Sequence, residues 1–367
     1  MTDPASGDQA SHTCVICLEE FRWDHVEAYR RNAEGFPRLV TLPPRESPRW
    51  PAEARGTLIR CPNEIGGDPH YFPVDFVLHD RPVVIGFVGA SNAGKTCLLA
   101  AMSGEIDRYR LAPRGLRTVP VDLTEHAAYR SHVVDPFYGK GIAPPHTQLV
   151  ELVTYTDAVL LTTESSSFPL VFFDAAGEQL KGLLDDAMAL RFLHRVDGLI
   201  FVADPTLVGG DGASAHGGQG SLDDPTYTAT IAGLRFQQSQ TRSRWLQIPS
   251  AVAITKSDLL RFEQPVDQWL GQPAPNLVDR DLRERESRDA YAYLHHRQAT
   301  AWLAPVDHFR QCSLHFVSAS GSSYLPAGRS EDVGRFARPA RPRRVLEPLV
   351  ALLDALGKID SQHVRGG

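Results

Sequence analysis

The sequence predicts an α/β fold, in which a mainly parallel sheet carries helices on both faces and follows a small cysteine-containing module. Two observations lead to this prediction. From Pro82 onward, short apolar runs rich in β-branched residues alternate with stretches of helical periodicity, which is the pattern of successive βαβ units. Before Pro82 the chain is rich in Pro, Arg and aromatic residues and has no long periodic run, as expected of a small module that needs a staple to fold.

The individual elements follow from these runs. The first run, PVVIGFVGA, is continuously apolar, which is typical of a parallel strand buried on both faces. Runs of this kind predict strands at 82–90, 149–155, 158–162, 170–173, 199–203, 251–254 and 315–318. The stretches between several of them predict helices at 95–102, 178–193, 228–241, 279–303 and 344–356.

Composition also divides the chain into regions. We expect a flexible tail at 1–10, the cysteine module at 11–80, the α/β domain at 81–358 and a second tail at 359–367. Within the large domain, the glycine-rich stretch 206–222 predicts a mobile insertion. The arginine-rich stretch 329–344 predicts an exposed linker before the last helix.

Charge and composition exclude several classes of protein. The 367 residues carry a net charge of −6, which argues against nucleic-acid binding through overall charge. No apolar run approaches the ~20 residues of a membrane-spanning helix, and the polar start MTDPASGDQASHT has no secretory signal core. Of the five cysteines, three lie in the first sixth of the chain, which favours a local metal site over a disulfide scaffold. We therefore expect a cytoplasmic protein.

The octapeptide GASNAGKT at 89–96 fits the phosphate-loop pattern G-x-x-x-x-G-K-[ST] and lies between a predicted strand and a predicted helix. Its glycines let backbone N–H groups curl around phosphate oxygens at a helix N-terminus. Lys95 is expected to reach the β- and γ-phosphates and Thr96 to bind Mg²⁺. The residues expected to bind nucleotide here are Gly89, Ser91, Asn92, Ala93, Gly94, Lys95, Thr96 and Cys97.

A second motif, LVFFDAAG at 170–177, is an apolar strand that ends in D-x-x-G. An acidic residue at the end of such a strand faces the phosphates, so Asp174 is expected to hold Mg²⁺, usually through water. Gly177 can offer its N–H to the γ-phosphate and move when that phosphate leaves.

Two further motifs select the base. In AVAITKSD at 251–258, the Asp258 carboxylate is an acceptor that matches the two N–H donors of guanine, and adenine offers no such pair. Thr255 precedes Lys256, whose stem can cover the base plane. In FVSAS at 316–320, Ser318 and Ala319 follow a strand, and the Ala319 N–H could bond guanine O6.

Together, in this order, these motifs resemble those of a Ras-like P-loop GTPase domain of the translation-factor-related (TRAFAC) class, over about residues 82–357. The DxAGE form at 174–178 is most similar to the bacterial double-GTPase family, whose members are often preceded by a cysteine-bearing segment. The resemblance implies a P-loop GTPase fold, GTP or GDP with Mg²⁺ as cofactors, and hydrolysis of the γ-phosphate.

Two positions depart from the family pattern. The switch I threonine is not obvious because 104–147 is longer than a small GTPase needs; we expect Thr147, with Thr118 as the alternative. Glu178 directly follows the D-x-x-G motif, the position at which Ras-like enzymes have a glutamine that orients the attacking water. The glutamine of this chain, Gln179, comes one position after it. We therefore expect slow hydrolysis that depends on an arginine from a partner or from Arg108, Arg110, Arg114, Arg117 or Arg130.

The cysteine module contains a C-x-x-C knuckle. Cys14 and Cys17 can grip one face of a tetrahedral Zn²⁺, and Cys61 could supply a third thiolate. His70 is the expected fourth ligand, with His25 and His12 as alternatives. The alternative is a degenerate site that no longer binds metal. If zinc is bound, we expect it to stabilise the fold of a zinc-ribbon-like module rather than to take part in catalysis.

The function expected is therefore a GTP-binding and GTP-hydrolysing regulatory switch, in which Lys95, Thr147, Gly177 and Glu178 act in catalysis. A protein partner or GTPase-activating factor, or a second GTPase, is expected, and the family resemblance suggests a bacterial signalling or conflict system. Two alternatives are a GTP-holding scaffold with negligible turnover and a P-loop ATPase.

Overall fold

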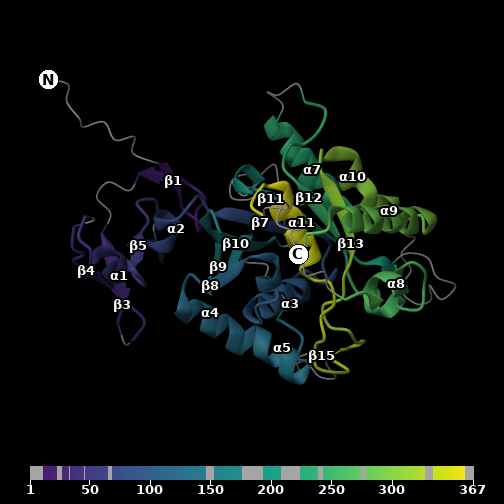
Figure 1. Cartoon of the computed structure of the whole chain (residues 1–367), viewed down its shortest axis with the longest axis horizontal. Coiled ribbons are helices and arrows are strands. Elements are labelled where there is room, and N and C mark those ends of the chain that lie inside the picture. The colour runs from purple at the N-terminus through teal and green to yellow at the C-terminus, as the bar shows by residue number, and fades with distance from the viewer. Residues whose placement is uncertain are drawn as a thin grey trace.

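The computed structural model describes residues 11–22, 27–32, 34–44, 46–64, 68–145, 153–175, 193–207, 224–238, 243–273, 278–326 and 334–359. A seven-stranded sheet forms its centre (Figure 1). In spatial order the strands are β13 (Cys312–Phe316), β12 (Ser250–Ile254), β11 (Gly198–Ala203), β7 (Val83–Val88), β10 (Ser167–Ala175), β9 (Val153–Thr162) and β8 (Arg117–Pro120). The first five are parallel, and β9 and β8 extend the sheet in antiparallel pairing.

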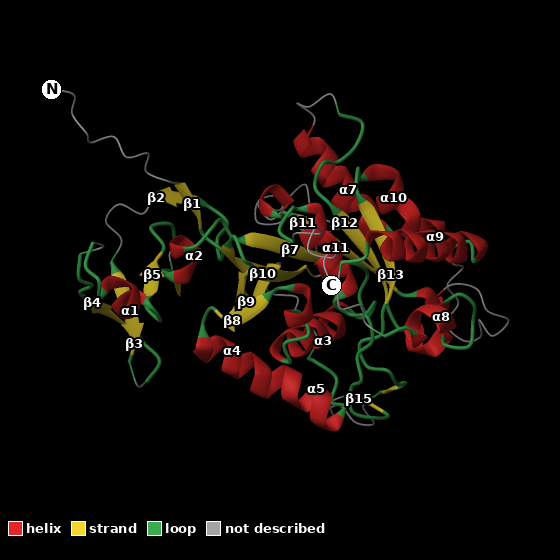
Figure 2. Ribbon diagram, viewed as in Figure 1, coloured by secondary structure: helices red, strands yellow, loops and turns green. Residues whose placement is uncertain are grey.

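Helices cover both faces of this sheet, as predicted. Along β7, Val84 and Val88 belong to one apolar core, and Ile85 and Phe87 to the other, because successive side chains of a strand point to opposite faces. One core takes in buried residues of α7 (Pro225–Gln237), α9 (Arg280–His296) and the segment around α10 (Ala304–His308). The other takes in α3 (Lys95–Asp107) and α11 (Glu347–Ala355). Figure 2 shows the helices on the two sides of the strands.

The expected strands and helices agree with the structure in kind, with shifted ends. The two strands expected at 149–155 and 158–162 are one strand, β9, within the described residues. A register shift between Phe172 and Phe173 of β10 leaves Thr156 of β9 without a partner residue. This β-bulge accommodates Thr156 as the extra residue, whereas the adjacent Asp157 pairs with Phe172. The helix expected at 178–193 lies almost wholly outside the described residues.

Several elements between α3 and β9 were not predicted. They are a 3₁₀ turn (Ala112–Arg114), β8, α4 (Leu123–Tyr129), a π-helical turn (Arg130–Val134) and α5 (Asp135–Lys140). The start of α4 did have a signal, because Asp122 caps the helix by accepting from the backbone N–H groups of Thr124 (2.9 Å) and Glu125 (3.2 Å).

The cysteine module consists of a β-hairpin, a four-stranded antiparallel sheet and two short helices. The hairpin is β1 (Ser11–Thr13) with β2 (Glu20–Arg22). The sheet order is β4 (Pro37–Val40), β3 (Ala28–Arg31), β5 (Leu58–Arg60) and β6 (Tyr71–Pro73), and the helices are α1 (Trp50–Ala54) and α2 (Asp75–Leu78). Its buried side chains, such as Phe72 and Phe76, join the same apolar core as Val84 and Val171 of the large sheet.

In the arginine-rich stretch expected to be an exposed linker, the described residues Arg335, Arg338, Arg341 and Arg343 are exposed, whereas Arg344 is buried. Arg335 lies in β15 (Arg335–Phe336), which pairs with β14 (Tyr324–Leu325), and Arg344 is only 7% exposed. Arg344 is buried because its guanidinium forms an ion pair with Glu286 inside the domain, 2.7 Å apart.

The remaining described elements are the helix α8 (Val266–Gly271) and 3₁₀ turns at Pro205–Leu207, Ser257–Leu260 and Thr300–Leu303. In the part of the chain described, no helix has both the length and the apolar character that crossing a bilayer requires.

Candidate functional site

The phosphate-loop residues form a tight turn between β7 and the N-terminus of α3. Gly94 has φ +97° and Asn92 has φ +63°, so the backbone curls through the left-handed region that glycine adopts without strain. The Lys95 side chain is buried, and its Nζ donates to the carbonyl oxygens of Gly89 (2.8 Å) and Ala90 (3.0 Å). The ammonium therefore lies inside the curl, next to backbone N–H groups that can bind an anion.

Glycine is required at position 89 because the backbone of β11 approaches it closely, and not because of its φ angle. A Cβ at this position would lie 2.7 Å from the carbonyl oxygen of Val202 on β11. Around it, Ser91 and Asn92 are exposed, Ala93 is buried, and Thr96 and Cys97 are half-buried in the first turn of α3. All the predicted loop residues are thus gathered at the carboxyl end of β7.

The T-K-x-D segment follows β12, which β11 separates from β7, and bonds directly to this loop. The hydroxyl of Thr255 lies 2.7 Å from the Ala93 carbonyl oxygen and 2.9 Å from that of Ala203. Lys256, with φ +52°, donates from Nζ to the Asn92 carbonyl oxygen at 3.1 Å. Thr255 and Lys256 therefore fix the loop and the base-selecting segment relative to each other.

Asp258 lies beside Ser318, although the two residues are 60 positions apart in sequence. The Ser318 hydroxyl donates to Asp258 Oδ1 at 2.7 Å and accepts from the Gly321 N–H at 3.1 Å. Asp258 is 7% exposed and Ala319 is 8% exposed. Burial raises the pKa of Asp258 above its ordinary value, and the Ser318 hydrogen bond opposes that rise. The acceptor predicted to read guanine thus lies next to the predicted Ser-Ala segment.

Asp204 belongs to this site and was missed by the sequence analysis. It follows β11, is 2% exposed, and forms an ion pair with Lys256. Its other oxygen accepts from the Thr206 hydroxyl at 2.6 Å. A signal was present, because an aspartate directly after the apolar run LIFVA ends a strand at the same sheet edge as Asp174.

Asp174 occupies the backbone position that the magnesium prediction requires. It pairs in register with Phe87, two residues before the loop glycine Gly89. Its side chain is not described, and Thr147, Gly177, Glu178 and Gln179 lie outside the described residues, so their roles stay predictions.

Thr118, the alternative switch I threonine, lies at the wrong end of the sheet. It pairs with Leu161 of β9, which pairs with Phe168 of β10. Phe168 is six residues before Asp174, and at ~3.3 Å per residue this separates it from the phosphate end by about 20 Å. The alternative is therefore wrong.

The five candidate arginines have partners or positions away from the phosphate-loop residues, and three of them lie around the C-terminal end of α3. Arg108 stacks on the Tyr138 ring at 3.7 Å, and Arg114 is buried in an ion pair with Glu347 at 2.6 Å. Arg110 forms an ion pair with Glu105, and Arg130 forms ion pairs with Asp107 and Asp135. Arg117 is an exposed residue of β8. Most of these positions surround the C-terminal end of α3, about 18 Å along the helix from Lys95. The expectation that one of the five acts as an arginine finger stays a prediction.

The module brings Cys14, Cys17, Cys61 and His70 together. Their ligand atoms all lie within 4.8 Å of one another, with Cys14 Sγ 3.2 Å from His70 Nε2 and Cys17 Sγ 3.8 Å from Cys61 Sγ. Zinc at about 2.3 Å from sulfur and 2.0 Å from nitrogen in tetrahedral geometry requires separations of about 3.8 Å and 3.5 Å. The donor set therefore fits zinc.

The local fold explains this choice of ligands. Cys61 follows β5 and His70 precedes β6, and the Cys61 N–H donates to the His70 carbonyl oxygen at 3.0 Å. Hydrogen bonds from Cys14 and Cys61 lower the pKa of the Cys17 thiol, whereas the pKa values of Cys14 and Cys61 are raised, so Cys17 is the one of the three that most readily forms a metal-binding thiolate. Of the two alternative ligands, His12 packs against Phe21 outside the cluster, and His25 lies outside the described residues.

The family model "Double-GTPase 2" matches residues 83–299, a span that includes the phosphate loop and the base-selecting segment around Asp258. Among solved structures, the chain is similar to a chain of the signal recognition particle receptor SRb-GTP/SRX complex from Chaetomium thermophilum. That similarity has 17% identity and a TM-score of 0.30, over 66% of this chain and 92% of that one. None of the curated proteins matches the sequence.

Proposed function

The chain belongs to the Double-GTPase 2 family, and from this premise we propose that it binds GTP through the loop 89–96 and reads the guanine base with Asp258. One observation supports this proposal above the others: Asp258 and Ser318 meet beside a lysine, Lys256, that also bonds to the phosphate loop. A base acceptor and a phosphate cradle are thus fixed to each other, as one nucleotide requires.

Each part of the site has a chemical task in this proposal. Lys95 and the loop N–H groups neutralise phosphate charge, and the curl of the loop orients the nucleotide for in-line attack on the γ-phosphate. Thr96 and Asp174 would hold Mg²⁺, which when bound screens the charge of the β- and γ-phosphates. Asp258 accepts from the N1 and N2 groups of guanine, and Asp204 orients Lys256 against the base.

Calorimetric titration of nucleotide-stripped protein with GTP and then ATP, in the presence of Mg²⁺, tests the base assignment. We expect ATP to bind at least ~100-fold more weakly, which corresponds to about 2.7 kcal/mol. Equal affinities would contradict the role of Asp258 and favour a P-loop ATPase.

Turnover is a separate part of the proposal. A carboxylate at Glu178 can accept from water but cannot donate to the γ-phosphate, so we propose slow hydrolysis that a protein partner accelerates. Single-turnover phosphate release should rise in Glu178→Gln. A wild-type rate equal to that of a stimulated GTPase would contradict slow turnover, and no release by either form would favour a GTP-holding scaffold.

The cysteine cluster supports a second role, a structural zinc site. We propose that Cys14, Cys17, Cys61 and His70 hold one Zn²⁺ per chain and that the ion fixes the fold of the module. Elemental analysis of purified protein should find about one zinc per chain and a loss in Cys17→Ser. The matched control is Cys312→Ser, because Cys312 lies on β13 away from the cluster. Full zinc content in Cys17→Ser would contradict the proposal.

A further inference from the structure

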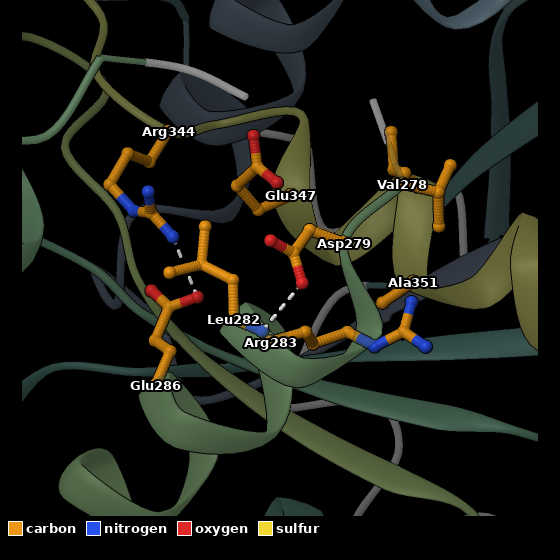
Figure 3. Close-up of a pocket in the computed structure, with 9 residues that line it drawn as sticks. Val278, Asp279, Leu282, Arg283, Glu286, Arg344, Glu347 and Ala351 are labelled. Atoms are coloured by element: carbon orange, nitrogen blue, oxygen red, sulfur yellow. Dashed lines mark hydrogen bonds and ion pairs between the residues drawn. The ribbon is translucent and has the colours of Figure 1, made fainter. Parts of the chain in front are cut away.

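A buried carboxylate, Glu286, lies behind the base-selecting segment. It is 1% exposed on α9 and accepts hydrogen bonds from three groups. These are Arg344 Nη2 at 2.7 Å, the Phe316 N–H at 3.1 Å and His315 Nδ1 at 2.9 Å. Figure 3 shows Glu286 facing Arg344 at the wall of a cavity between α9 and α11.

One of these bonds, together with a bond to the neighbouring Ser287, satisfies backbone N–H groups at the free edge of the sheet. β13 is the last strand of the sheet and pairs with β12 on one side only. On its other side, α9 supplies side-chain partners: Glu286 accepts from the Phe316 N–H, and the Ser287 hydroxyl accepts from the Leu314 N–H at 3.0 Å. The helix thus replaces a neighbouring strand, which fixes the position of β13 up to Phe316.

The bond from Arg344 to Glu286 fixes a segment that bonds to Ser318. Arg343 donates its N–H to the Ser318 carbonyl oxygen at 2.8 Å and accepts from the Ser318 N–H at 3.0 Å. The next residue, Arg344, has φ +58°, a left-handed conformation that surrounding contacts must hold. The ion pair with Glu286 is such a contact, because Arg344 is buried and its guanidinium donates into that carboxylate.

Glu286 therefore bonds to both chain segments that meet at Ser318. One segment is β13, which reaches Ser318 two residues after Phe316, and the other is the stretch that ends at Arg344. Ser318 in turn donates to Asp258 at 2.7 Å. Burying a carboxylate costs desolvation free energy, so an ion pair such as Glu286–Arg344 stabilises the fold only weakly. It can instead specify one arrangement of the chain segments that it joins.

We propose that Glu286 is a positioning residue for base discrimination: by holding Phe316 and Arg344 it fixes Ser318, and through Ser318 it orients the Asp258 carboxylate toward the guanine edge. The inference rests on the proposed function, since it assumes that Asp258 reads guanine. It adds a specificity-determining residue that does not touch the nucleotide.

The test compares GTP with inosine triphosphate, whose base lacks the 2-amino group, in the full-length chain. The ratio of the two affinities reports the second hydrogen bond to Asp258 and does not change when a fraction of the protein is unfolded. We expect Glu286→Gln to lower the GTP:ITP affinity ratio by about 5-fold, a part of what one hydrogen bond to a charged group contributes. The matched control is Glu284→Gln, which removes an exposed carboxylate from the same helix and should leave the ratio unchanged.

Arg344→Lys provides a second, milder variant in case Glu286→Gln does not fold. It keeps the positive charge beside Glu286 but loses the planar guanidinium, so the ratio should fall by about 2-fold. A wild-type ratio above 1 that neither variant lowers would overturn this inference and leave the proposed function intact. A wild-type protein that binds GTP, ITP and ATP with equal affinity would instead overturn the proposed function.

Discussion

At the residue scale, Asp258 shows a conflict between folding and recognition. Burial raises the pKa of its carboxyl group, so ionisation is less favourable in the folded than in the unfolded chain, and the buried charge of Asp258 lowers the stability of the folded protein at neutral pH. Base recognition requires the ionised form, because only a carboxylate accepts from both N–H groups of guanine.

The variant Asp258→Asn separates these two effects. Without nucleotide, we expect a higher thermal midpoint than wild type at pH 7, since the buried charge is gone and the amide oxygen of the new side chain can still accept from Ser318. GTP affinity should fall on the order of 100-fold, because the amide cannot accept from both guanine donors. Differential scanning fluorimetry and calorimetric titration measure the two quantities; a lower midpoint together with unchanged GTP affinity would contradict both arguments.

The same carboxyl predicts the pH dependence of binding. Its pKa is raised, so GTP affinity should fall with decreasing pH and begin to do so above the ordinary aspartate range of about 3.9. Asp258 should contribute a gain in apo stability over the same interval, measured as the difference between wild type and Asp258→Asn, because protonation removes its buried charge. Titrations between about pH 7.5 and pH 5 check this, with Asp258→Asn as the control whose GTP affinity should stay flat.

At the scale of single elements, the phosphate loop depends on one close approach. In Gly89→Ala the new methyl group would meet the backbone oxygen of Val202 at 2.7 Å, and neither strand can move without disturbing the parallel pairing of β7 with β11. We expect a loss of about 2–4 kcal/mol in the free energy of unfolding, together with weaker binding of GTP and ATP alike.

The matched control is Gly139→Ala in α5. A Cβ there meets no atom within 4 Å, and alanine favours the helix by up to about 1 kcal/mol. Urea unfolding of both variants gives the comparison. Equal stability of the two would show that the loop tolerates a side chain at Gly89.

The sequence predicted those elements whose residues have one dominant environment. β7 and β11 are buried at every position, so their continuous apolar runs identify them directly. β8 has only four residues, with exposed Arg117 and Val119 alternating with half-buried neighbours, and such a short edge strand has no comparable signal. The motif positions around Lys95 and Asp258 were predictable because local backbone chemistry defines them.

Tertiary contacts determine the features that the sequence did not predict. The burial of Arg344 depends on Glu286, a residue 58 positions earlier, and no local pattern reports that partner. The role of Asp204 depends on Lys256 from the neighbouring strand. The exclusion of Thr118 depends on strand order, which short apolar runs leave open.

At the scale of the whole molecule, the cysteine module and the α/β domain share contacts. Phe72 and Phe76 of the module belong to the same buried cluster as Val84 and Val171 of the large sheet, and α2 packs against β10. Ion pairs also join the two parts, between Arg195 and Glu20 at 2.8 Å and between Arg31 and Glu125 at 2.8 Å. Because exposed ion pairs contribute little, the shared apolar core is the stronger connection.

This connection predicts how metal removal affects the full chain. If zinc fixes the module, a chelator removes the support for apolar residues that the large sheet also uses, so the whole chain should unfold in one transition at a lower temperature. We expect a decrease of a few degrees, since at about 2.1 cal/mol/K per residue a loss of about 1 kcal/mol lowers the midpoint of a chain of 367 residues by roughly 1.3 °C. Far-UV circular dichroism and tryptophan fluorescence should give the same midpoint, because Trp50 reports on the module and Trp269 and Trp302 on the large domain.

The cysteine variants provide the control for this experiment. Chelator should not shift the midpoint of Cys17→Ser further, because that variant already lacks a ligand, whereas Cys312→Ser should respond as the wild type does. A separate early transition with an unchanged main transition would show that the module unfolds alone. In that case the apolar contacts between Phe76 and the sheet would contribute little to the stability of the nucleotide site, and any influence of the module on GTP binding would have to act through another route.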